Sequence, residues 1–82
     1  MVRADFKEFQ KSLGRRICDL RKQKGWSQEE FAYESGLGRA SMGTIERGEA
    51  NIRLSTMLGI CQALGTTVCE LLKGVGETPK RY

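Results

Sequence analysis

Apolar residues along this chain recur at intervals of three and four, and no segment shows the apolar–polar alternation of a half-buried strand. This spacing places apolar side chains on one face of a helix. Glycines and capping residues divide the pattern into five segments, each predicted to be a short helix. The predicted fold is therefore all-α, a compact five-helix domain over residues 1–73 followed by a short flexible tail over residues 74–82.

The first predicted helix is the longest. Gly25 is placed to end it in the left-handed conformation that glycine adopts freely. Its apolar stripe consists of Phe6, Phe9, Leu13, Ile17 and Leu20. Residues 54–65 repeat the helical pattern later in the chain, and Thr67 with Glu70 forms a capping box that opens a short last helix over residues 68–74.

The middle of the chain predicts two short helices joined by a tight turn. Ser27 and Glu30 have the spacing of a capping box, and Gly36 is placed to end the helix that they open. A second short helix is predicted from about Gly38 to Arg47. Such a pair forms a helix-turn-helix, whose second helix enters the major groove of DNA.

One face of the helix over 38–47 is built from small residues and arginines. Met42 and Ile45 fall on its inner side, with the preceding Leu37, and are predicted to hold the two helices together. Small side chains on the outer side would let the helix approach the base edges closely. The predicted base contacts are Arg39, Ala40, Gly43 and Thr44.

Each of these residue types suits a particular partner on DNA. An arginine such as Arg39 can donate two hydrogen bonds to O6 and N7 of guanine, and the methyl groups of Ala40 and Thr44 suit the thymine methyl. Arg47, at the helix exit, is better placed for a phosphate. Gln28 lies in a first helical turn, where free backbone N–H groups also bind phosphate. The predicted phosphate contacts are thus Gln28, Ser41 and Arg47.

The charge distribution fits an anionic partner without requiring one. The net charge is +4, and residues 1–24 hold eight basic residues against three acidic ones. Residues 25–52 hold five glutamates against Arg39 and Arg47. A basic first quarter is equally typical of a solvated face, and any pair of helices has an exposed side.

Residues 13–72 resemble the XRE-type, phage-repressor-like helix-turn-helix family. The resemblance is carried by the stretches LRKQKGWSQEEFA, GLGRAS and IERGEAN. It implies a five-helix domain that binds operator DNA, usually as a homodimer on a partly palindromic site. It also implies that Gln28 binds phosphate, that positions 38, 39, 40, 43 and 44 face the bases, and that Arg47 contacts the backbone.

The same resemblance pairs Arg21 with Glu46. The pair either aims Arg21 at a phosphate or only ties two helices together. Gly38 replaces the serine or threonine that many relatives carry at that N-cap, so no side-chain contact is expected from it. Asn51, with the two residues after it, replaces a common N-P-S sequence and resembles the controller proteins of restriction–modification systems.

A chain of 82 residues buries only about 60% of its unfolded surface, which makes dimerisation an expectation. The last predicted helix has more apolar surface than it can hide against a small core. The predicted interface consists of Val68, Leu71 and Leu72, joined by Met57 and Ile60. Burial inside the single domain is the alternative for Met57 and Ile60.

Other classes of function find little support in the sequence. The chain has no histidine, and its three cysteines lack the spacing of a metal site, so no metal, cofactor or enzymatic activity is expected. The thiols of Cys18, Cys61 and Cys69 are predicted to be inert core residues. No signal peptide or membrane span is recognisable, which predicts a cytoplasmic protein. No small-molecule effector is expected. The main alternative is an antitoxin-type repressor that also binds a partner protein.

Overall fold

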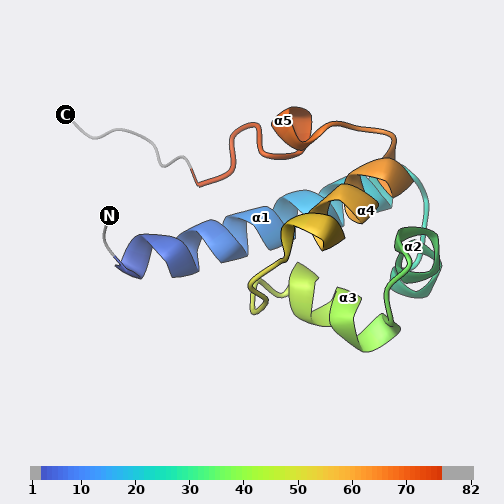
Figure 1. Ribbon diagram of the computed structural model, residues 1–82, viewed down its shortest axis with the longest axis horizontal. Helices are drawn as coiled ribbons and strands as arrows, with labels where there is room; N and C mark the ends of the chain where they lie inside the picture. The colour runs from blue at the N-terminus through green and yellow to red at the C-terminus, as the bar shows by residue number, and fades with distance from the viewer. Residues whose placement is uncertain (1–2, 77–82) are drawn as a thin grey trace.

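Five helices make up the part of the chain that the computed structural model describes, residues 3–76, with side chains described from residue 6 (Figure 1). No strand occurs among these residues, so the prediction of an all-α fold is confirmed. None of the described helices is both long and apolar enough to span a membrane. The helices are α1 (Arg3–Gln23), α2 (Gln28–Ser35), α3 (Arg39–Glu46), α4 (Leu54–Leu64) and α5 (Val68–Leu71).

The helix ends form where the local signals place them. The Ser27 hydroxyl accepts a hydrogen bond from the Glu30 N–H at 3.1 Å, and the Glu30 carboxylate accepts one from the Ser27 N–H at 2.8 Å. Gly36 ends α2 with a φ of 73°, in the left-handed region. The last helix is shorter than predicted: α5 ends at Leu71 rather than at residue 74. Residues 72–76 form turns instead.

The core lies between α1, α4 and the pair α2–α3. Its fully buried side chains come from every helix, which explains how such short elements stay folded. Met42 and Ile45 are buried, so the prediction that they face inward is confirmed. The largest fully buried side chains are Ile17, Phe31, Met42, Ile60 and Leu71.

Helix α1 crosses the end of α3 at very short range. A Cβ atom on Gly14 would lie 2.7 Å from the carbonyl oxygens of both Ile45 and Glu46. Just after α3, Gly48 has a φ of +76°, and a Cβ there would lie 2.6 Å from the Cα of Lys11. Two glycines therefore let the backbone of α1 touch the backbone around the end of α3, which fixes the position of α3.

Helix α5 is held against α1 by side-chain hydrogen bonds. The Arg16 guanidinium donates to the carbonyl oxygens of Glu70 at 2.8 Å and Leu71 at 3.1 Å. Further on, the Gly76 N–H donates to the Ser12 hydroxyl at 3.0 Å. Gly76, in the predicted tail, thus lies against α1, while residues 77–82 fall outside the described part of the chain.

Candidate nucleic-acid interface

The outer side of α3 lines an open hollow that α2 completes at one edge. Its lining contains two arginines and no carboxylate, so the hollow suits an anionic ligand. Most of the residues predicted to contact DNA are brought together here. The lining residues are Gln28, Arg39, Ala40, Gly43, Thr44 and Arg47.

The two ends of this face differ in how their arginines are held. Arg39, at the start of α3, is exposed and donates from Nε to Oε1 of Gln28 at 3.3 Å. Ala40 is exposed beside it, and the Thr44 hydroxyl donates to the Ala40 carbonyl at 3.0 Å. Arg47, at the other end, forms an exposed ion pair with Glu49 at 3.2 Å.

Gly43 is buried, although it was predicted to contact bases. The Nη1 atom of Arg47 lies 3.1 Å from the position that a Cβ on Gly43 would occupy, and Oε1 of Gln28 lies 3.8 Å from it. The long side chains of Arg47 and Gln28 therefore lie next to Gly43, and a base contact at this residue stays a prediction.

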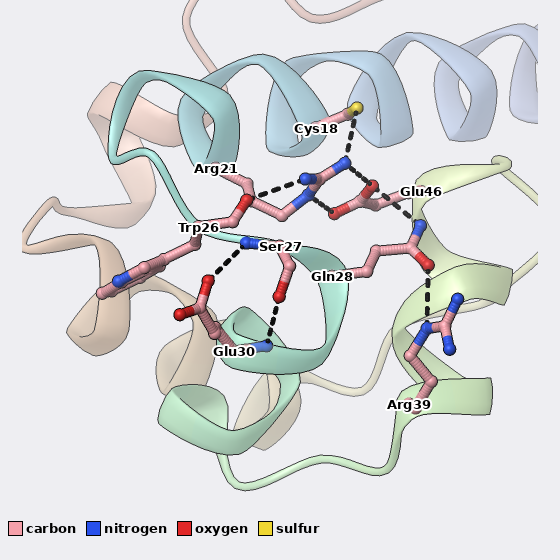
Figure 2. Close-up of polar contacts among 8 residues, drawn as sticks. All are labelled: Cys18, Arg21, Trp26, Ser27, Gln28, Glu30, Arg39 and Glu46. Carbon is pink, nitrogen blue, oxygen red and sulfur yellow. Dashed lines mark hydrogen bonds and ion pairs between the residues drawn. The ribbon is translucent and has the colours of Figure 1, made fainter.

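Behind the hollow, Arg21 and Glu46 join α1 to α3 (Figure 2). The guanidinium donates from Nε to Oε2 of Glu46 at 2.8 Å and from Nη2 to Oε1 at 3.0 Å. The two side chains are only 13% and 4% exposed. Burial alone would raise the pKa of Glu46, but hydrogen bonds from Arg21 and Gln28 outweigh it and the pKa is lowered. The bond to Glu46 likewise raises the pKa of Arg21.

The surroundings of Arg21 favour a structural tie over a phosphate contact. Its guanidinium also donates to the Trp26 carbonyl at 2.9 Å and to the Cys18 sulfur at 3.4 Å. Four hydrogen bonds within the protein leave one of its five N–H groups for other partners. The prediction that Arg21 contacts phosphate thus receives little support from the geometry.

Gln28 stands between this buried pair and the hollow. Its Nε2 donates to Oε1 of Glu46 at 3.0 Å, while its Oε1 accepts from Arg39 (Figure 2). The predicted phosphate contact from the Gln28 side chain is therefore limited to the second Nε2 hydrogen, beside the free N–H groups at the start of α2. The link from Glu46 to Arg39 was not foreseen from the sequence.

A second concavity lies beside the first, between α3 and the start of α4. Ser41, which is exposed and predicted to contact phosphate, lines it with Thr44, Asn51 and Arg53. Arg53 is the N-cap of α4 and makes no side-chain cap hydrogen bond. Asn51 and Arg53 thus extend the polar surface beside α3. No DNA contact was predicted for either residue from the sequence.

Two of the five residues predicted to form a dimer interface cannot do so in this fold. Ile60 and Leu71 are both 0% exposed, because they pack into the core of the single chain. Met57, Val68 and Leu72 remain half-buried at the surface. Leu54 and Leu58 on α4, for which no role was predicted, are 71% and 49% exposed.

The three cysteines are free thiols in different surroundings. Cys61 is buried, and burial raises the pKa of its thiol. Cys18 is half-buried, but Cys69 is exposed, so the prediction of a core thiol is wrong for Cys69. Within residues 3–76, no group of three or more candidate ligands is arranged to hold a metal ion.

Comparison with known proteins identifies clear relatives. The model of the helix-turn-helix domain family matches residues 12–73. An uncharacterized HTH-type transcriptional regulator of Sinorhizobium fredii is 35% identical over 72 residues, which cover 88% of this chain and 94% of that protein. Control protein C.SmaI of Serratia marcescens is 37% identical over 71 residues, 87% of this chain and 84% of that one.

Solved structures of transcriptional control proteins are also similar to this chain. The restriction-modification controller protein C.AhdI from Aeromonas hydrophila superimposes with a TM-score of 0.74 and 40% identity, over 76% of this chain and 94% of that one. The clp gene regulator ClgR from Corynebacterium glutamicum gives a TM-score of 0.77 and 25% identity, over 84% and 92%.

Proposed function

The chain belongs to the helix-turn-helix domain family of DNA-binding transcriptional regulators, and on this premise we propose that it binds a partly palindromic operator as a homodimer. In this proposal α3 lies in the major groove. The protein acts on DNA in the cytoplasm, without a small-molecule effector. The family is one of regulators rather than of enzymes.

The observation that carries the proposal is the hollow along α3. Two arginines and several small side chains line a face that no carboxylate in its lining opposes. A helix with small residues at its centre can lie deep in the groove, with charged groups at both ends. This is the distribution of charge and size that a recognition helix needs.

The residues of this face have separate tasks. Arg39 binds a base edge at the start of the helix, and the methyl groups of Ala40 and Thr44 contact thymine. Arg47 leaves Glu49 for a phosphate, and Ser41 with the N–H groups at the start of α2 binds further phosphates. Arg21 and Glu46 hold α1 and α3 together behind the face.

The proposed dimer uses the apolar surface of α4 and α5, which lie side by side (Figure 1). Leu54 and Leu58 are one helical turn apart on α4 and are exposed, which is costly in a monomer. Val68 and Leu72 on α5 add half-buried apolar surface. A two-fold interface of this kind would set two copies of α3 about 34 Å apart, one turn of DNA.

The relatives also suggest which system the protein regulates. C.SmaI and C.AhdI are controller proteins, and the chain aligns with most of the length of both. We infer that this protein controls transcription of restriction–modification genes. A binding site selected from random DNA should then recur beside such genes in the source genome, and a site found only elsewhere would contradict this role.

Fluorescence anisotropy tests the DNA-binding proposal. A duplex selected from a random library and a scrambled duplex of the same composition are titrated at moderate salt. Arg39→Ala should weaken binding to the selected duplex by about 1–3 kcal/mol and relax base preference. Lys73→Ala removes the same charge from the exposed turn just after α5, a helix that lies on the other side of α1 from α3 (Figure 1). This control should change neither the affinity nor the base preference. Equal affinity of the unmodified protein for both duplexes would refute the proposal.

A further inference from the structure

We propose that Glu46 is a positioning residue for Arg39, which acts through the side-chain amide of Gln28 and thereby fixes how Arg39 approaches a base. The inference rests on the proposed function, because it concerns the residue assigned to base recognition. It assigns a role in sequence preference to a carboxylate that is nearly inaccessible to solvent.

The Glu46 carboxylate determines which way the Gln28 amide is turned. An ionised carboxylate can only accept hydrogen bonds, so the Glu46 oxygen must face the amide NH₂ group, as it does at 3.0 Å. A flipped amide would set oxygen against oxygen. Arg21 holds the Glu46 carboxylate with two further hydrogen bonds, so this carboxylate cannot turn away.

Once the NH₂ group is bound to Glu46 at the end of α3, the amide oxygen faces the start of the same helix, where Arg39 lies. An oxygen at that point selects a donor, and the guanidinium of Arg39 supplies one from Nε at 3.3 Å. A guanidinium can only donate, so the contact could not form with the amide reversed. The direction of every bond from Arg21 to Arg39 is therefore set by the buried ion pair (Figure 2).

This contact has a consequence for base recognition. With Nε engaged by Gln28, Arg39 keeps its terminal Nη1 and Nη2 groups free for DNA. These two donors lie side by side and match two adjacent acceptors on one base edge, which guanine presents at O6 and N7. We infer that Arg39 reads guanine end-on, and that side-on approaches through Nε are disfavoured.

The test is a double-mutant cycle on the ratio of affinities for selected and scrambled duplexes. Gln28→Met keeps the side-chain length but removes both amide bonds. It should lower the ratio about five- to tenfold, the effect of about one lost hydrogen bond. In an Arg39→Ala background the same substitution should leave the ratio unchanged, because its effect passes through Arg39.

Glu46→Gln provides the second variant, since its new amide can donate as well as accept and no longer fixes the direction of Gln28. It should lower the ratio while the melting curve still shows a folded protein. Replacement of the contacted guanine by 7-deazaguanine should weaken binding by the unmodified protein but not by Arg39→Ala.

The possible failures are distinct. If the unmodified protein does not distinguish the two duplexes, the proposed function falls and the inference with it. If Arg39→Ala lowers the ratio while Gln28→Met and Glu46→Gln keep it, only the inference is overturned. An equal effect of Gln28→Met with and without Arg39 would also overturn it, since Gln28 would then act on DNA by itself.

Discussion

Replacement of Gly14 by alanine is expected to destabilise the protein, although alanine is the better helix former. In the interior of a helix, Gly→Ala gains about 1 kcal/mol in propensity. The new methyl group would, however, lie 2.7 Å from two backbone carbonyl oxygens at the end of α3. These atoms belong to a packed helix end and cannot rotate away as a side chain could.

The expected magnitude follows from these two opposing terms. Insertion of a methyl group into a well-packed site costs roughly 1–3 kcal/mol, and contact with backbone on both sides places Gly14 at the upper end. After the gain in propensity, the net loss is about 2 kcal/mol. For a domain of this size, the midpoint of thermal unfolding should fall by roughly 8–16 °C.

Gly43→Ala is the matched control, because it makes the same change in the interior of another short helix. Its methyl group would meet the end of the flexible Arg47 side chain at 3.1 Å and Oε1 of Gln28 at 3.8 Å, but no backbone atom. This variant should be neutral or up to about 1 kcal/mol more stable. Circular dichroism melts of both variants measure the difference. A Gly14→Ala protein that melts at or above the unmodified protein would show that α1 and α3 do not meet at this glycine.

Three further predictions concern charge and assembly. Because the pKa of Glu46 is lowered in the fold, its contribution to stability is present above about pH 4.3 and is lost as the pH falls further. The difference in free energy of unfolding between the unmodified protein and Glu46→Gln, measured by urea denaturation, should therefore narrow between about pH 6 and about pH 3.5. A constant difference would refute this. Arg47→Ala should weaken binding to selected and scrambled duplexes alike and flatten the salt slope by about one unit, whereas a loss confined to the selected duplex would mark Arg47 as a base contact. Leu58→Glu should shift the protein to monomer in sedimentation velocity. Tyr33→Ser, which changes an exposed residue on α2, is the control, and equal dimerisation of both variants would exclude α4 from the interface.

Local signals predicted much of the fold. The capping box at Ser27 and the left-handed Gly36 depend only on neighbouring residues, so the sequence indicates where α2 begins and ends. Met42 and Ile45 were placed correctly because they are the two large apolar residues of α3 and fall on the same side of the helix. The family resemblance then placed Arg21 close to Glu46, which the ion pair confirms.

The remaining features depend on how the helices pack, which periodicity does not specify. Helix α4 carries apolar residues on most of its circumference, so the pattern alone could not tell buried Ile60 from exposed Leu54. The bond from Arg39 to Gln28 joins side chains eleven residues apart on different helices. The burial of Gly43 likewise requires knowledge of where the long Arg47 side chain lies.

Both α3 and α5 take their positions from α1, through the glycine crossing at one point and the Arg16 hydrogen bonds at another. A helix of four residues is not stable alone, so α5 cannot move independently of this support. In the proposed dimer, joined through α4 and α5, α1 therefore links each copy of α3 to the interface. We therefore expect little tolerance for operators whose halves are separated by one extra base pair, a displacement of about 3.4 Å along the duplex.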